Sequence, residues 1–121
     1  MSPVLAAFLA KVRGGQPVEF EETLAVIAAH YHYRPTRFCN GLGADCLVNE
    51  PGSNEGSCKI FYFARLHGLS EAETLALFGG YYRDEVLRRP TGNDHRNIRT
   101  FMRYGWSGIH FAEAALVPQE G

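Results

Sequence analysis

The sequence predicts a single α+β domain that is mostly helical, with about five helices and a small antiparallel sheet. Apolar residues recur at helical spacing over most of the chain, and aromatic residues interrupted by a proline follow the second such stretch. A further apolar stretch near the C-terminus supplies a partner for that extended segment. The length of 121 residues suits one domain covering 1–121. With 45% hydrophobic residues, the chain can form a core that needs no stabilising cross-links.

Two amphipathic helices are expected at the beginning of the chain. The first covers residues 4–12, and the Gly14-Gly15 pair ends its apolar pattern. The second covers residues 19–30, where early glutamates suit the positive N-terminal end of a helix.

An extended segment and a long loop are expected next. Residues 31–38 are rich in aromatic side chains but contain Pro35, which favours a strand at the edge of a sheet. Residues 40–56 show no periodicity and are rich in glycine, and a loop of this length is often functional. Leu47 and Val48 are expected to add a very short strand within it.

The remaining helices have clearer boundaries. Residues 57–67 are apolar nearly all round, which predicts a helix buried in the middle of the domain. Ser70 and Glu73 form a capping-box pattern that starts a helix ending before Pro90, with a kink or close contact at Gly79-Gly80.

A last helix is expected with Asn93 or Asp94 as its N-cap and Gly105 just past its end. Residues 109–117 are then expected to return as a strand or hairpin beside residues 31–38.

Charge and cysteine content narrow the function classes. Twelve basic residues against 13 acidic ones argue against a general nucleic-acid or membrane-surface binder, which would usually be strongly basic. The chain has an odd number of cysteines, namely Cys39, Cys46 and Cys58, and no two of them are spaced as CxxC. Both features favour reduced thiols and a cytosolic origin. No apolar run reaches the roughly 18 residues of a membrane span, and residues 1–13 do not read as a signal peptide.

Five motifs together resemble the HopJ type III effector family. They are Pro35-Thr36-x-Phe38, Asn49-Glu50-x-Gly52-x-Asn54-x-Gly56-Ser57-Cys58-Lys59-Ile60-Phe61, Phe78-Gly79-x-Tyr81-Tyr82-Arg83, Asp94-His95-x-Asn97-Ile98-Arg99-x-Phe101-Met102 and Gly105-Trp106-x-Gly108-Ile109-x-Phe111. The chain departs from the family pattern at His32 and over residues 42–46, where its loop is longer. The resemblance implies a bacterial protein but carries over no catalytic or binding residues.

Polar residues in the predicted loops and helix starts are the candidate ligand-binding set, because binding groups tend to lie there. They are Asn49, Glu50, Asn54, Ser57, Lys59, Asp94, His95, Arg96 and Arg99. If the 49–59 loop met the 94–99 helix start, free backbone N–H groups at both would favour an anion. His95 would then make affinity depend on pH near its ordinary pKa of about 6.5. The alternative without a binding role is that these residues only cap helices and fix turns.

A thiol hydrolase using Cys58 and His95, oriented by Asp94 or Asn97, is the catalytic alternative. Apolar neighbours instead favour a buried Cys58 that packs as a small hydrophobe. His30 and His32 would share a face on a strand and could bind a metal there. Neither a metal nor a cofactor is expected, however, since closed zinc sites require four ligands.

The sequence therefore favours a non-catalytic binding protein whose partner is another protein or a small anionic ligand. Its expected location is the bacterial cytoplasm, with type III secretion into a host cell as the alternative that the family name raises.

Overall fold

The structure is a computed structural model that describes residues 2–119, so Met1 and residues 120–121 of the predicted domain lie outside it. In chain order its elements are α1 (Pro3–Arg13), α2 (Phe20–His30), β1 (Tyr31–Tyr33), β2 (Phe38–Asn40), η1 (Gly43–Asp45), β3 (Leu47–Asn49), α3 (Glu55–Leu66), α4 (Glu71–Ala76), η2 (Tyr81–Val86), α5 (Arg96–Tyr104), η3 (Gly105–Gly108), β4 (His110–Phe111) and β5 (Leu116–Pro118). The predicted α+β class is confirmed. None of the described helices is long and apolar enough to cross a membrane.

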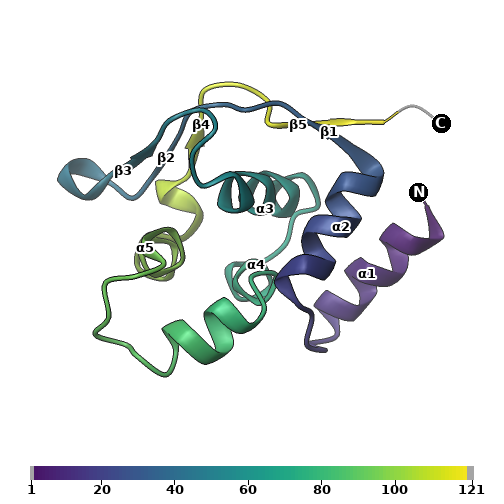
Figure 1. Cartoon of the computed structure of the whole chain (residues 1–121), viewed down its shortest axis with the longest axis horizontal. Coiled ribbons are helices and arrows are strands. Elements are labelled where there is room, and N and C mark those ends of the chain that lie inside the picture. The colour runs from purple at the N-terminus through teal and green to yellow at the C-terminus, as the bar shows by residue number, and fades with distance from the viewer. Residues whose placement is uncertain (1, 120–121) are drawn as a thin grey trace.

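Helix α3 forms the middle of the domain, as its apolar sequence predicts. Figure 1 shows α1 and α2 on one side of it, α5 on the other, and the short strands above. Phe61 is fully buried on α3, and its ring lies 4.9–6.1 Å from the rings of Phe38, Phe78 and Phe101. One side chain therefore joins β2, the segment after α4, and α5 in a single aromatic core.

The predicted extended segment divides between two small antiparallel sheets. β1 pairs with β5, so that Tyr31 lies opposite Pro118, and β2 lies between β3 and β4. Pro35 lies in the connection between β1 and β2, where its missing N–H removes no ladder bond. The predicted return of the C-terminal segment beside residues 31–38 is confirmed.

The helix predicted from Ser70 to Pro90 is interrupted. Its capping box at Ser70 and Glu73 is present, but α4 ends at Ala76 and the chain resumes as the π-helix η2. Gly79 between them has φ +60°, and a Cβ there would lie 2.6 Å from the backbone nitrogen of Phe20. Glycine suits this position for two reasons: it adopts the positive φ at the break in the helix, and its lack of a Cβ permits the close contact with the backbone of Phe20.

Two local predictions are wrong. Neither Asn93 nor Asp94 caps α5, because the N-cap is His95 and its side chain makes no cap hydrogen bond. Cys39 and Cys46 are not free thiols but form a disulfide with a Cα–Cα distance of 5.8 Å. The β2–β3 hairpin brings them together, a tertiary effect that an odd cysteine count does not reveal. Cys58 is free and buried.

Candidate functional site

Two residues with left-handed backbone mark the candidate site. Among residues 2–119, Asn54 (φ 49°) and His95 (φ 48°) are the non-glycine residues with positive φ. Each immediately precedes a helix, α3 and α5 respectively, and neither side chain caps its helix. Asn and His are enriched in this conformation, but it remains uncommon, so the fold must hold both residues there.

Both helix starts open into one surface pocket of about 610 Å³. The predicted 49–59 loop and the 94–99 helix start therefore meet in space. The walls of the pocket are Phe20, Leu47, Asn54, Gly56, Ser57, Phe78, Tyr81, Asn93, Asp94, His95, Arg96, Asn97 and Ile98. Its aromatic and aliphatic walls were not part of the predicted site. They come from core positions, which their sequence pattern did not distinguish from ordinary packing residues.

The first N–H groups of α3 and α5 have no hydrogen-bond partner within the described residues. The amide of Cys58 already bonds the carbonyl of Asn54, and the amide of Arg99 bonds that of His95. Within residues 2–119 the three amides between each pair, 55–57 and 96–98, make no hydrogen bond. Such groups carry the positive end of the helix dipole, and two helix starts at one pocket favour an anion there.

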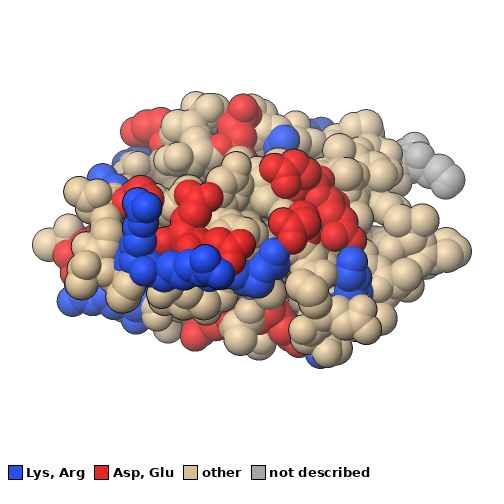
Figure 2. Space-filling model, turned by 60° about the horizontal axis from the view of Figure 1, so that its bottom comes forward, with Lys and Arg blue, Asp and Glu red and all other residues tan. Residues whose placement is uncertain are grey.

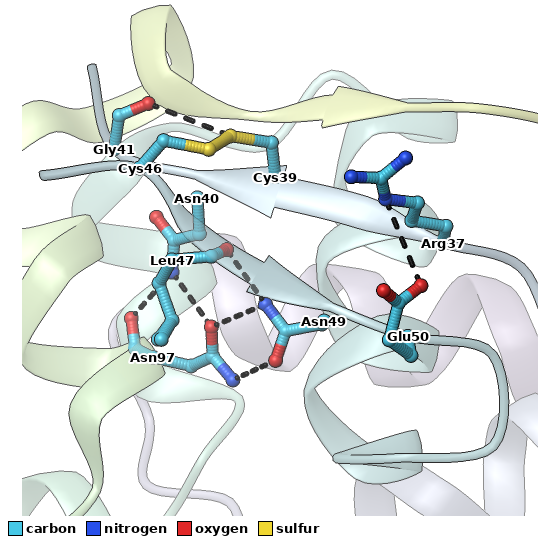
Figure 3. Close-up of a disulfide and its surroundings, with 9 residues drawn as sticks. All are labelled: Arg37, Cys39, Asn40, Gly41, Cys46, Leu47, Asn49, Glu50 and Asn97. Carbon is cyan, nitrogen blue, oxygen red and sulfur yellow. Dashed lines mark hydrogen bonds and ion pairs between the residues drawn. A yellow bond between two sulfur atoms is a disulfide. The ribbon is translucent and has the colours of Figure 1, made fainter. Parts of the chain in front are cut away.

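A cluster of four asparagines, three of them buried, holds the two helix starts together. Asn40 on β2 donates to the carbonyl and Oδ1 of Asn97 on α5, at 2.9 and 3.0 Å. Asn49 and Asn97 bond each other through both amide groups, and Asn54 donates to Oδ1 of Asn49 at 2.7 Å. Figure 3 shows the side chains of Asn40, Asn49 and Asn97 pointing toward one another from three different elements.

The role of this asparagine cluster differs from the prediction. Asn49 is 1% exposed and its amide is fully engaged inside the protein, so it positions the site and does not line it. The position of Asn40 at the end of a short strand carried no sequence signal for this role. Only the tertiary fold brings it opposite Asn97.

Charged groups at the rim of the pocket are already paired. Nη2 of Arg99 donates to Oδ1 of Asp94 at 2.7 Å, and this bond holds the pKa of Asp94 below its usual value. His95 Nε2 lies 2.8 Å from Oε1 of Glu85, and its ring lies 5.2 Å from that of Tyr81. Arg96 is exposed and makes no ion pair with any described residue, which leaves it free to meet a ligand.

The one group of potential metal ligands in the described chain is also at this rim. Ligand atoms of Glu85, Asp94 and His95 lie within 4.8 Å of one another. Glu85 and Asp94 are exposed, and their pairing with His95 and Arg99 accounts for the geometry without an ion. His30 and His32 do not act together, because His30 Nδ1 bonds the carbonyl of Val26 within α2 while His32 is exposed on β1.

Some predicted ligand-binding residues lie outside the pocket. Glu50 is exposed and lies 3.7 Å from Arg37, while the ammonium group of Lys59 lies 4.7 Å from the ring centre of Tyr33. Arg99 does not line the pocket either, but it donates hydrogen bonds to the carbonyl and Oδ1 of Asp94 and so holds that rim residue in place. The predicted residues that do line the pocket are Asn54, Ser57, Asp94, His95 and Arg96.

Cys58 does not share the pocket with His95. The thiol is 1% exposed, and burial raises its pKa, which opposes formation of a thiolate. Its polar neighbours are the backbone of Thr36 and the side chain of Tyr33, on the side of the strands. This geometry does not assemble the nucleophile and base that a thiol hydrolase requires.

Comparison with known proteins relates the chain to a described family and to a solved structure. The sequence pattern of the family described as "HopJ type III effector protein" matches residues 5–116. A solved structure described as "Crystal structure of unknown function protein VPA0580" has 43% sequence identity and a TM-score of 0.91. The similarity covers 98% of this chain and 97% of that one. No functionally curated protein gives a significant match to this chain.

Proposed function

The chain belongs to the HopJ type III effector family, and we propose that it is a non-catalytic binding protein that holds a small anionic ligand between α3 and α5. The observation that carries this proposal is the convergence of two uncapped helix N-termini on one pocket. A buried asparagine cluster fixes their relative position, so the donors are arranged before any ligand arrives.

The walls of the pocket suggest the shape of the ligand. Amides at the starts of α3 and α5, with the Arg96 side chain, favour a phosphate or carboxylate group. Phe20, Phe78 and Tyr81 supply an apolar wall beside these donors. Ligand sites commonly combine such apolar walls with a few polar groups that fix orientation. We therefore expect an anionic group attached to a flat apolar body.

Titration calorimetry with phenyl phosphate tests this function. We expect saturable binding of phenyl phosphate and no binding of phenol at the same concentrations. Replacing Arg96 with alanine should weaken binding about tenfold, because a charge-assisted hydrogen bond is lost. The matched control Arg34→Ala removes an exposed arginine that does not line the pocket and should leave affinity unchanged. Equal heats for phenyl phosphate and phenol would contradict an anion site.

We propose the bacterial cytoplasm as its location, with delivery to a host through a type III system as the alternative. The Cys39–Cys46 disulfide removes the support that reduced thiols would have given to the cytoplasm. Family membership supports delivery, whereas α1 packs Leu5, Phe8 and Leu9 into the core and would have to unfold for passage. A translocation assay with the full chain fused to a host-activated reporter separates the two. Signal that depends on the secretion system would assign the host cell, and its absence would assign the cytoplasm.

A further inference from the structure

A second surface feature lies apart from the anion pocket. Leu87, just after η2, is 48% exposed, and Met102 on α5 is 46% exposed. Although they are far apart in sequence, both line one groove of about 370 Å³. Val86, which is 1% exposed, contributes to the apolar lining, and Pro90 adds further apolar surface. This volume is near the lower end of the range for ligand sites of about 300–1,000 Å³.

The groove is surrounded by positive charge. The two segments that form it, 86–92 and 99–103, contain four arginines and no aspartate or glutamate, although the whole chain has a net charge of −1. Two of these arginines, Arg99 and Arg103, line the groove directly. The other two, Arg88 and Arg89, lie between the lining residues Leu87 and Pro90 in sequence. A basic rim around an apolar centre is therefore built into this part of the surface.

Arg99 is already paired with Asp94 at 2.7 Å, whereas the other three arginines have long ion pairs or none within the described residues. Arg88 and Arg103 are 78% and 71% exposed, and their nearest carboxylates, on Asp84 and Asp45, lie 3.7 and 3.6 Å away. Arg89 makes no ion pair with any residue in the described range. Figure 2 shows the face that carries η2 and the following turn, where Lys and Arg side chains form a band beside acidic ones.

We propose that this groove is a docking site for an acidic segment of another protein that inserts one or two large apolar side chains. The exposed Leu87 and Met102 would cover those side chains, and Arg88, Arg89 and Arg103 would meet flanking aspartates or glutamates. Methionine and arginine are enriched at protein interfaces, methionine because it adapts to partners of different shape. A concave apolar site receives a side chain, whereas insertion into a lipid surface requires an apolar group that protrudes.

Fluorescence anisotropy with labelled helical peptides tests the proposal. The probe peptide carries leucine and phenylalanine at i, i+3 and i+4 with glutamates elsewhere. One control peptide replaces the glutamates with lysine, and the other replaces the apolar residues with serine. We expect the probe peptide to bind at least about tenfold more tightly than either control, because both apolar burial and charge pairing contribute. Binding should weaken as salt is raised, since the rim charges are exposed.

Protein variants then locate the binding site. L87S combined with M102S should weaken probe binding about tenfold or more. Leu66→Ser is the matched control, because Leu66 is similarly exposed at 47% but lies at the end of α3. Arg89→Glu should weaken binding more than Arg34→Glu, which changes the net charge equally. Loss of phenyl phosphate binding is not expected in any of these variants, which separates this surface from the anion pocket.

Several results would overturn the proposal. They include no binding of the probe at millimolar concentration, equal binding of the control peptides, and binding that survives L87S with M102S. Binding of the protein to phosphatidylglycerol vesicles that L87S with M102S abolishes would assign the surface to a membrane instead. Sedimentation that shows dimers lost in the same variant would assign it to a second copy of the chain.

Discussion

The side chains of Asn49 and Asn97 bond each other in both directions, with Asn97 Nδ2 donating to Asn49 Oδ1 at 2.8 Å and Asn49 Nδ2 donating to Asn97 Oδ1 at 3.1 Å. This pair joins the end of β3, just before the loop that leads to α3, to the first turn of α5. Asn54 also bonds Asn49, so the left-handed residue before α3 is tied to the same pair. The geometry of the anion pocket therefore depends on hydrogen bonds among side-chain amides, including that of Asn49, which does not line the pocket.

Replacing Asn97 with alanine should lower the free energy of unfolding by about 3 kcal/mol, because three buried hydrogen bonds are lost and each contributes about 1 kcal/mol. Asn40 Nδ2 and Asn49 Nδ2 would each lose the acceptor Asn97 Oδ1, and Asn49 Oδ1 would lose the donor Asn97 Nδ2. Urea denaturation measures the change. The control Asn93→Ala alters an exposed pocket residue and should change stability by less than about 0.5 kcal/mol. A similar small loss in both variants would show that the asparagine cluster is not a structural tie.

Removing the disulfide should destabilise the β2–β3 hairpin. Cys39 and Cys46 close a short loop, and the loss of this cross-link should cost about 2 kcal/mol through the entropy of the unfolded chain. Asp45 within the loop accepts a hydrogen bond from Tyr104, which couples the hairpin to α5. The double replacement of both cysteines with serine, compared with the native chain with and without reductant, measures the effect. Insensitivity of the native chain to reductant would contradict it.

Cys58 should be inert to alkylating reagents in the folded protein. Its thiol is buried and its pKa is raised by that burial, so both access and thiolate formation are suppressed. Thiol titration should give no rapid reaction under native, non-reducing conditions and one equivalent after unfolding in denaturant. Rapid reaction of Cys58 in the folded protein at neutral pH would instead support the thiol-hydrolase alternative.

His67 should make stability depend on pH below neutrality. Its Nε2 lies 2.6 Å from the Tyr31 hydroxyl, and burial, with a smaller effect of Arg13, lowers its pKa below the ordinary value of 6.5. The unfolded chain then binds a proton more readily than the folded one, so stability is fully present above pH 6.5 and falls as pH drops toward the folded pKa. Urea midpoints from pH 7.5 to 5 should show this slope, and His67→Gln should reduce it. His32→Gln, at an exposed strand position, should retain it.

Local patterns in the sequence predicted the elements whose cause is local. The apolar run of α3 and the Ser70 capping box identify a buried helix and a helix start, and both are present. The left-handed N-cap at His95 has no local sequence signal, and the groups that its side chain contacts, on Glu85 and Tyr81, lie in η2. Gly79 signalled a kink, but the backbone of Phe20 that makes it necessary is more than fifty residues away in sequence.

The site was predicted less completely than the fold. The two helix starts that form it carry polar residues visible in the sequence, but their meeting depends on Asn40, Asn49 and Asn97. Asparagine in a loop ordinarily indicates a turn, so nothing in the pattern marked a buried cluster. The sequence pattern around Phe20, Phe78 and Tyr81, which form the aromatic wall, is likewise typical of core residues.

Backbone NMR during titration with phenyl phosphate shows directly whether the two helix starts bind one anion. We expect saturable shifts of the amides of Gly56, Ser57, Asn97 and Ile98 that share one dissociation constant, because these residues line one pocket. Phenol, which lacks the anionic group, should leave these amides unmoved. Shifts confined to one helix start, or centred on residues outside the pocket, would contradict an anion site formed by the two helices together.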